Sequence, residues 1–537
     1  MIRNPVLPGF NPDPSFCRVG DDDFYIATST FEWVPGVQIH HSRDLVNWTL
    51  VNRPLTRKSQ LDLRGNPDSC GVWAPCLSHA DGLFWLVYTD VKRFEGNFKD
   101  AHNYIVTAPA IEGPWTDPVY VNSSGFDPSL FHDSDGKKWF LNMLWNHRTE
   151  SVGGKPKTPA FDGILLQEWD AERGCLVGPV TNIYRGTARG LVEGPHLFKR
   201  YGYYYLVTAE GGTGYDHAVT MARSRSLTGP YETHPQSHLI SSRDAPDAPL
   251  QRAGHGQVVA LTDDSVYVAH LCTRPLPGTR RSPLGRETAL QRCEWHDDGW
   301  LYLAQGGMVP ALDVPSPAPD TQPAARLPVL RNFADGSTVL PPEFQWLRTP
   351  EPERLFTLTG STLRLTGRES VGSWFEQSLV ARRQEDHHFR AETALVYAPT
   401  SYQQAAGLTL YYNRHKFHLL AVTWDENTLG RVLSILSCPG RWPDGQVEFP
   451  LAEPVRLPAE GLVRLAAEVN GAELQFLADW GQGWQAVGPA LDASVISDEG
   501  GRGEHASFTG AFVGMLAFDT SGSARVADFE RFDYLPG

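Results

Sequence analysis

The chain has 537 residues, of which 41% are hydrophobic, and its formal net charge is −15 at pH 7. An acidic chain without a basic cluster excludes nucleic acid and an anionic membrane as main partners. No stretch reaches the roughly 18 consecutive apolar residues that a membrane-spanning helix needs, so we expect no membrane partner.

The N-terminal residues 1–16 lack the apolar core of a secretion signal, which predicts a cytoplasmic protein unless a signal has already been removed. The seven cysteines are scattered, without a CxxC pair or the Cys/His spacing of a metal site. An odd number of scattered thiols is typical of a reduced intracellular chain. We therefore expect no structural disulfides.

Residues 1–310 repeat one pattern: a Pro or Gly step, a short apolar strand, a polar turn and an aromatic-rich strand. The repeats begin at Asp13, Ala74, Asp127, Gly194 and His255. Each turn contains Gly or Asp, as hairpins require. Four short strands in each unit of about 60 residues, repeated five times, predict a five-bladed β-propeller. A β-sandwich with accidental internal similarity is the alternative.

Residues 311–330 are rich in Pro and Ala and poor in large apolar side chains, which predicts a linker or an extended strap. Alternating strands follow without the repeat, and the apolar–polar alternation of residues 463–469 is typical of a half-buried strand. Residues 331–537 are therefore predicted to form a β-sandwich domain. The expected fold class is all-β, a five-bladed β-propeller followed by a β-sandwich.

Acidic residues mark three of the repeat starts. The first strand of each propeller blade lines the central axis, so Asp13, Asp127 and Glu193 should converge at one mouth, beside His255 and Trp73. Glu193 lies one place early, and we expect a small register change to absorb the difference. Converging carboxylates raise the pKa of at least one of them, as acid–base chemistry near neutral pH requires. Asp-Pro is also a turn motif, but three acids in a repeat favour catalysis.

Aromatic residues follow or flank the innermost strands, where loops should rim the same mouth. They are Phe31, Trp33, Trp73, Phe94 and Trp145. Sugars pack their C–H faces on such rings, so the mouth fits a carbohydrate pocket. Each ring could instead belong to the core, and Trp73, directly before a repeat start, is the strongest candidate.

Several ordered motifs resemble glycoside hydrolase family 43. They are NPDPSF (11–16), FEWVPG (31–36), GVWAPC (71–76), GFDPSLF (125–131), LVEGPHLF (191–198), GHGQVV (254–259) and LGRETALQ (284–291). The two-domain length resembles the β-xylosidase branch, and FTGAFVG (508–514) extends the resemblance into the second domain. The family implies a five-bladed propeller catalytic domain followed by a β-sandwich.

The resemblance also implies inverting hydrolysis by single displacement. Asp13 looks like the general base that activates water, Glu193 like the general acid that protonates the leaving oxygen, and Asp127 like the third carboxylate that tunes and orients the acid. Arg286 resembles the arginine that holds sugar hydroxyls. His255 either serves without a metal or faces a calcium ion through water; no other cofactor is expected.

Side chains of both domains should enclose the terminal sugar. Phe31, Trp73 and Trp145 look like walls of its subsite, and Phe508 looks like the side chain that the second domain contributes to the pocket. A pocket closed at one end predicts removal of single terminal sugars rather than cleavage within a chain.

The leading hypothesis is an exo-acting 1,4-β-xylosidase that releases xylose from the non-reducing end of xylo-oligosaccharides. Because xylose and arabinofuranose present similar hydroxyl patterns, this hypothesis includes α-L-arabinofuranosidase activity as a second activity. The alternatives are a dedicated α-L-arabinofuranosidase, a retaining fructan hydrolase, whose WMNDPNG start this chain replaces with NPDPSF, and a non-catalytic carbohydrate-binding propeller. The family also implies a homo-oligomer, either a dimer or a tetramer.

Overall fold

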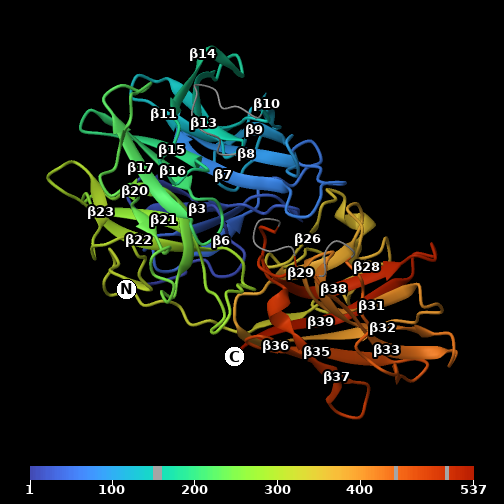
Figure 1. Ribbon diagram of the computed structural model, residues 1–537. Helices are drawn as coiled ribbons and strands as arrows, with labels where there is room; N and C mark the ends of the chain where they lie inside the picture. The colour runs from blue at the N-terminus through green and yellow to red at the C-terminus, as the bar shows by residue number, and fades with distance from the viewer. Residues whose placement is uncertain (149–159, 441–444, 502–506) are drawn as a thin grey trace.

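The computed structural model describes residues 1–537 except for 149–159, 441–444 and 502–506. Figure 1 shows two all-β bodies, with the N-terminal residues in blue to yellow-green and the C-terminal residues in orange to red. The helical segments in the described residues are two short 3-10 turns, Pro352–Arg354 and Ala493–Val495. The predicted all-β fold class is confirmed.

Antiparallel sheets with sequential strand order follow one another through the first body, five of them in the described residues. The first three contain β2 (Ser15–Val19), β3 (Asp23–Thr28), β5 (Gln38–Ser42) and β6 (Thr49–Asn52); β7 (Gly71–Ala80), β8 (Leu83–Arg93), β9 (Asp100–Ala108) and β10 (Val119–Asn122); and β11 (Ser129–His132), β12 (Lys138–Trp145), β13 (Phe161–Asp170) and β14 (Cys175–Tyr184). The last two contain β15 (Glu193–Arg200), β16 (Tyr203–Glu210), β17 (Ala218–Ser224) and β18 (Glu232–Thr233), with β19 (Ile240–Ser241) beside β17; and β20 (Gln251–Ala260), β21 (Val266–Thr273), β22 (Glu287–Trp295) and β23 (Leu301–Leu303).

The first strands of these sheets form a closed ring. β2 contacts β7, β7 contacts β11, β11 contacts β15, β15 contacts β20, and β20 contacts β2. Outside the ring, β1 (Ile2–Arg3) pairs with β24 (Asp313–Val314), which ties the N-terminus to the chain that follows the last blade. The five-bladed propeller predicted from the repeats is therefore confirmed, with each innermost strand on the axis.

The residues that begin the repeats share one backbone conformation. Asp13, Ala74, Asp127, Gly194 and His255 all have a positive φ, between 33° and 58°. A positive φ is uncommon for residues other than glycine, so its recurrence shows that these positions are structurally equivalent.

Glu193 precedes the equivalent position by one residue, because the positive φ of its blade falls on Gly194. The β-bulge between Glu193 and His196 does not correct this offset, since the same bulge occurs between Trp73 and Cys76 of the second blade. The expectation that a register change would align Glu193 with the two aspartates is therefore wrong. Glu193 is the structural equivalent of Trp73.

The second body is a β-sandwich of two antiparallel sheets, as predicted. One sheet contains β25 (Val329–Asn332), β27 (Phe356–Leu358), β28 (Leu363–Thr366), β30 (His388–Val396), β35 (Leu462–Asn470), β36 (Glu473–Asp479), β37 (Gln485–Asp492) and β39 (Val526–Pro536). The other contains β26 (Gln345–Leu347), β29 (Ser378–Arg383), β31 (Gln404–Asn413), β32 (Lys416–Asp425), β33 (Gly430–Pro439), β34 (Val455–Arg456) and β38 (Phe512–Asp519), with β4 (Trp33–Val34) at its edge. Alternating buried side chains of both sheets fill the space between them.

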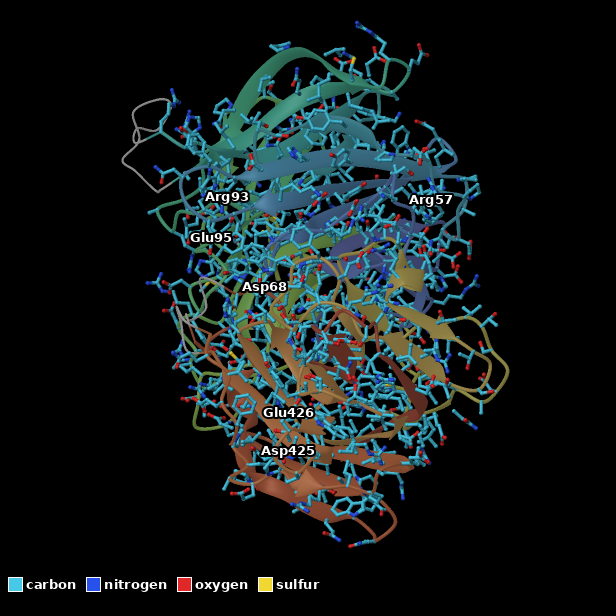
Figure 2. All side chains as sticks on the ribbon, turned by 90° about the vertical axis from the view of Figure 1, so that its right-hand side faces the viewer. Arg57, Asp68, Arg93, Glu95, Asp425 and Glu426 are labelled. Atoms are coloured by element: carbon cyan, nitrogen blue, oxygen red, sulfur yellow. The ribbon has the colours of Figure 1, made fainter. Side chains whose placement is uncertain are left out.

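The two bodies share backbone and side-chain contacts. β4 comes from the first blade but pairs with β26 of the sandwich, and the Trp33 ring stacks on Phe512 at 3.7 Å. Trp33 is fully buried there, so the expectation that it rims the pocket mouth is wrong. Asp68, which lies at the boundary in Figure 2, pairs with Arg348 at 2.7 Å and Arg414 at 3.2 Å. The sandwich is thus fixed against the face of the propeller that holds the pocket.

Candidate active site

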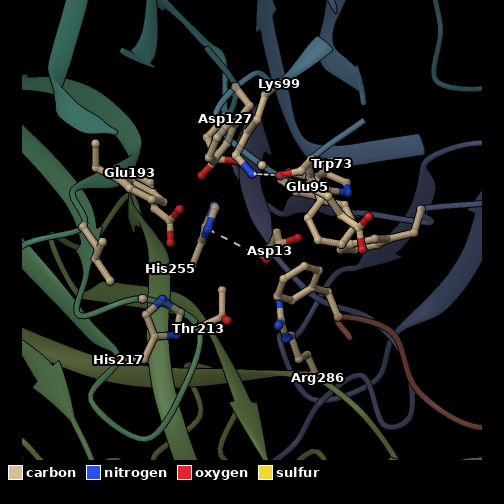
Figure 3. A pocket seen from close by; sticks show the side chains of 18 residues that line it. Asp13, Trp73, Glu95, Lys99, Asp127, Glu193, Thr213, His217, His255 and Arg286 are labelled. Atoms are coloured by element: carbon tan, nitrogen blue, oxygen red, sulfur yellow. Dashed lines mark hydrogen bonds and ion pairs between the residues drawn. The ribbon is translucent and has the colours of Figure 1, made fainter. Parts of the chain in front are cut away.

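A cavity of about 420 Å³ lies where the propeller axis meets the sandwich (Figure 3). Its walls include Asp13, Asp127, Glu193, His255 and Arg286. Because Trp73 and Lys99 of the second blade line it too, side chains from all five blades reach one space, as the repeat predicted.

The three carboxylates are each less than a tenth exposed. Asp13 Oδ2 accepts a hydrogen bond from Ser29 Oγ at 2.6 Å, and Asp13 Oδ1 lies 3.8 Å from His255 Nδ1. Asp127 Oδ2 accepts a hydrogen bond from the backbone N–H of Gly194 at 3.1 Å, so Asp127 is tied to the residue next to Glu193. The surrounding protein therefore holds the acids in place.

The environment of Glu193 favours its protonated form. Burial, followed by the charge of Asp13, raises the pKa of Glu193 from 4.5 to about 8, although Arg286 and Lys99 oppose the rise. Burial and the charges of Glu193 and Asp13 raise the pKa of Asp127 well above its usual range. Glu193 can therefore hold a proton at neutral pH and give it to a bound molecule.

Arg286 supplies a buried cation to the cavity wall. Its side chain is 2% exposed, and its Nε and Nη2 have no hydrogen-bond partner among the described residues. The guanidinium lies 5.0 Å from the centre of the Phe508 ring. A guanidinium is a fixed fork of five donors, and such a fork at a cavity wall suits a ligand rich in hydroxyl groups.

Aromatic rings form the apolar walls. Trp73 lies at the centre of this group, with its ring 5.8 Å from Phe31, 5.3 Å from Phe126 and 5.9 Å from Phe508. Phe508 belongs to the sandwich, and its backbone N–H donates to Ser69 Oγ of the propeller at 3.1 Å. As predicted from the sequence, Phe31, Trp73 and Phe508 line the cavity.

Trp145 does not line the cavity, contrary to the sequence-based prediction. Its Nε1 donates to the carbonyl of Asn97 at 3.0 Å, and its ring packs against Phe126 and Phe161, which take its place at the wall. The ring thus supports the wall from behind.

Lys99 is a lining residue that the sequence did not indicate. Its Nζ donates to the carbonyl of Phe94 at 2.7 Å and lies 4.3 Å from the centre of the Trp145 ring. Burial lowers the pKa of Lys99 to about 8. Lys99 lies in an irregular segment between β8 and β9, outside the repeated pattern, so periodicity offered no signal for it.

His217 was also missed. It lies on the cavity wall beside His255, and its Nδ1 is 3.2 Å from the carbonyl oxygen of Arg252. A Cβ at residue 254 would come within 2.3 Å of the His217 ring, so only glycine fits there. Burial lowers the pKa of His217 well below its usual range, which keeps this wall of the pocket uncharged at neutral pH.

The surroundings of His255 do not form a recognisable metal site. In the part of the chain that the structure describes, no group of three or more His, Cys, Asp or Glu side chains could hold a metal ion. Burial lowers the pKa of His255, which keeps the ring neutral beside Asp13. Calcium also takes backbone and water oxygens as ligands, so calcium that faces His255 through water stays an untested prediction.

Comparisons with known proteins cover the whole chain. Residues 2–301 match the family described as glycosyl hydrolases family 43, and residues 331–535 match the β-xylosidase C-terminal concanavalin A-like domain. The chain is 57% identical over 539 residues to xylosidase/arabinosidase 43B of Humicola insolens, covering 100% of this chain and 98% of that protein. It is 47% identical over 546 residues to a β-xylosidase of Bacillus subtilis, covering 99% of each. The crystal structure of a xylan β-1,4-xylosidase from Bacillus halodurans is similar over 100% of both chains, with a TM-score of 0.94 and 49% identity.

Proposed function

The chain belongs to glycosyl hydrolases family 43, and we propose that it removes single xylose residues from the non-reducing ends of 1,4-β-xylo-oligosaccharides by inverting hydrolysis. The observation that carries the proposal is the meeting of Asp13 and Glu193 in one cavity, where the pKa of Glu193 rises to about 8. A binding protein without catalysis needs no such pair of buried acids.

Asp13 is the proposed general base. It removes a proton from a water molecule as the water oxygen attacks the anomeric carbon. Ser29 Oγ donates to Asp13 Oδ2, which fixes the carboxylate plane before substrate binds.

Glu193 is the proposed general acid. As the glycosidic C–O bond breaks, its proton passes to the leaving oxygen, and single displacement inverts the configuration at the anomeric carbon. Asp127 accepts from the N–H of Gly194 and so orients the backbone next to the acid. Because the charge of Glu193 raises the pKa of Asp127, the two carboxyls interact, and Asp127 is the proposed residue that tunes the acid.

The cavity suits the end of a sugar chain. Its volume of about 420 Å³ lies toward the lower end of the range for small-molecule pockets. Phe31 and Trp73 offer faces to sugar C–H groups, Arg286 offers donors to hydroxyls, and Phe508 of the sandwich limits the space. An end-on pocket of this kind releases one sugar in each reaction.

A second activity on α-L-arabinofuranosides belongs to the proposal, because the Humicola insolens relative carries both activities in its name. A dedicated α-L-arabinofuranosidase is the second candidate. The ratio of kcat/KM on the 4-nitrophenyl β-xyloside and α-L-arabinofuranoside separates the two, and a dominant rate on the arabinofuranoside would replace the main proposal.

Product analysis of the full chain tests the reaction itself. Xylotetraose should yield xylose and xylotriose first, and NMR should detect α-xylose before mutarotation. Early xylobiose would contradict terminal cleavage, and β-xylose as the first anomer would contradict inversion. EDTA should leave kcat/KM unchanged, because none of the proposed steps uses a metal.

The cellular location and the oligomeric state of the enzyme are further parts of the proposal. All seven cysteines lie in the described residues and form no disulfide, which is consistent with a cytoplasmic enzyme acting on imported oligosaccharides. No helix in the described residues is long and apolar enough to cross a membrane. We expect a dimer or tetramer, which light scattering during gel filtration would detect; cell fractionation tests the location.

A further inference from the structure

Asp498 lies at the centre of a buried charge network between the two domains. It belongs to the sandwich and is fully buried, as is Arg252 of the propeller. Asp498 Oδ2 is 3.1 Å from Arg252 Nη1 and 3.5 Å from Arg286 Nε. One carboxylate oxygen thus faces two guanidinium groups, and one of them belongs to the pocket.

The charges explain how this carboxylate helps to hold Arg286 in position. Two cations buried close together repel each other strongly when no anion lies between them. Arg286 Nε forms no hydrogen bond with Asp498 Oδ2 at 3.5 Å, so the attraction between them is of charge. Without Asp498, Glu499 would still contact Arg252 Nη1, but the Arg286 guanidinium would lose the anion that attracts it toward the sandwich.

The other oxygen of Asp498 leads to Phe508. Asp498 Oδ1 accepts a hydrogen bond from the Tyr412 hydroxyl, and the same hydroxyl accepts from the backbone N–H of Thr509 at 2.8 Å. Thr509 follows Phe508 directly, and the Phe508 ring contacts the Arg286 guanidinium. Asp498 therefore contacts Arg286 with one oxygen and supports the backbone beside Phe508 with the other.

We infer that Asp498 is a positioning residue of the sugar subsite, which holds Arg286 and Phe508 together at the geometry that the terminal sugar requires. The inference rests on the proposed function only for the role given to Arg286. It makes the sandwich a part of the active site through charge as well as through the Phe508 ring, and no contact between Asp498 and the substrate is involved.

Asp498→Asn tests the inference in the full chain. The amide keeps the size of the side chain but removes its charge, so kcat/KM should fall about 10- to 100-fold, as expected when a binding group moves by about 1 Å. Glu499→Gln is the matched control, because Glu499 contacts Arg252 Nη1 at 2.9 Å and the Ser282 N–H at 2.9 Å but not Arg286. The control should change kcat/KM less than about threefold.

A double-mutant cycle separates positioning from a general loss of structure. In an Arg286→Lys background, Asp498→Asn should lower kcat/KM by less than about threefold, because the guanidinium that it positions is gone. An equal loss in both backgrounds would show that Asp498 does not act through Arg286 and would overturn the inference.

Tyr412→Phe keeps the inference testable if Asp498→Asn does not fold. This variant keeps all charges and removes the link to Thr509, so it should lower kcat/KM, and the loss should vanish in a Phe508→Ala background. An unchanged kcat/KM, or a loss that persists in that background, would refute the inference. The assay uses whichever aryl glycoside the wild-type chain hydrolyses faster. The wild-type rates then test whether xylose is the substrate, and the ratios between variants and wild type test the inference.

Discussion

Replacing Glu193 with Gln should stabilise the protein while it removes most of the activity on natural glycosides. The pKa of Glu193 rises from 4.5 to about 8 in the folded chain. A pKa that rises by one corresponds to about 1.4 kcal/mol of preference for the neutral form. At pH 7, where an unfolded chain ionises this carboxyl, the raised pKa lowers the free energy of unfolding by about 3 kcal/mol, and above pH 8 by about 5 kcal/mol. Gln removes this ionisation and its unfavourable effect.

The effect of Glu193 on the stability of the folded chain changes with pH in a direction that its raised pKa determines. A raised pKa in the folded state means that the contribution of Glu193 to stability is fully present below pH 4.5 and is lost as pH rises through 8. The difference in melting temperature between Glu193→Gln and the wild type should therefore grow from pH 5 to pH 8 and then level off. Calorimetry at each pH measures it, and several degrees are expected at pH 8.

Activity should change in the opposite direction. Loss of a general acid lowers kcat on xylobiose about 10²- to 10⁴-fold, and less on 4-nitrophenyl glycosides, whose leaving group needs little protonation. Exposed Glu473 provides the control, since Glu473→Gln should change neither stability nor activity. If Glu193→Gln melts at the wild-type temperature at both pH 5 and pH 8, the electrostatic reasoning fails; full turnover of xylobiose would remove Glu193 as the acid.

Three other variants test the remaining parts of the pocket. Asp13→Ala should lose activity on every glycoside, including 4-nitrophenyl substrates, because water is no longer activated; steady-state rates that recover on a good leaving group would contradict this role. Phe508→Ala should lower kcat/KM for xylobiose about tenfold, because one aromatic contact contributes roughly 1 kcal/mol beyond its buried area, and an unchanged value would exclude the ring from the subsite. Lys99→Met removes a charge that lowers the pKa of Glu193, so the high-pH limb of kcat/KM should move to higher pH; a limb that stays in place or moves down would refute this.

Much of the architecture could be predicted because it repeats. The same step, strand and turn recur at Asp13, Ala74, Asp127, Gly194 and His255, and all five residues have a positive φ. A blade cannot bury both of its faces alone, so repeated blades must stack around an axis, and the residues at the start of each innermost strand must meet there. For this reason the meeting of the two aspartates with His255 followed from the pattern of the sequence.

Side chains outside the repeat were harder to predict. Trp145 ends β12 and Phe161 begins β13, both are aromatic, and only packing decides which ring reaches the cavity. Trp33 lies between β3 and β5 of the first blade, yet its backbone pairs with the sandwich. Hydrophobicity indicates that such rings are buried, but it does not indicate which neighbour buries them.

The all-β class, the propeller, the sandwich and the gathering of acids could be read from the chain before any coordinates, because they follow from local periodicity and from geometry that all blades share. Three features could not be read in this way. Glu193 reaches the cavity from a different repeat position than the two aspartates do. Lys99 and His217 line the cavity as well, and Asp498 faces two arginines. Those contacts join segments far apart in the chain. They depend on how loops and two finished domains pack together, and no short stretch of sequence carries that information.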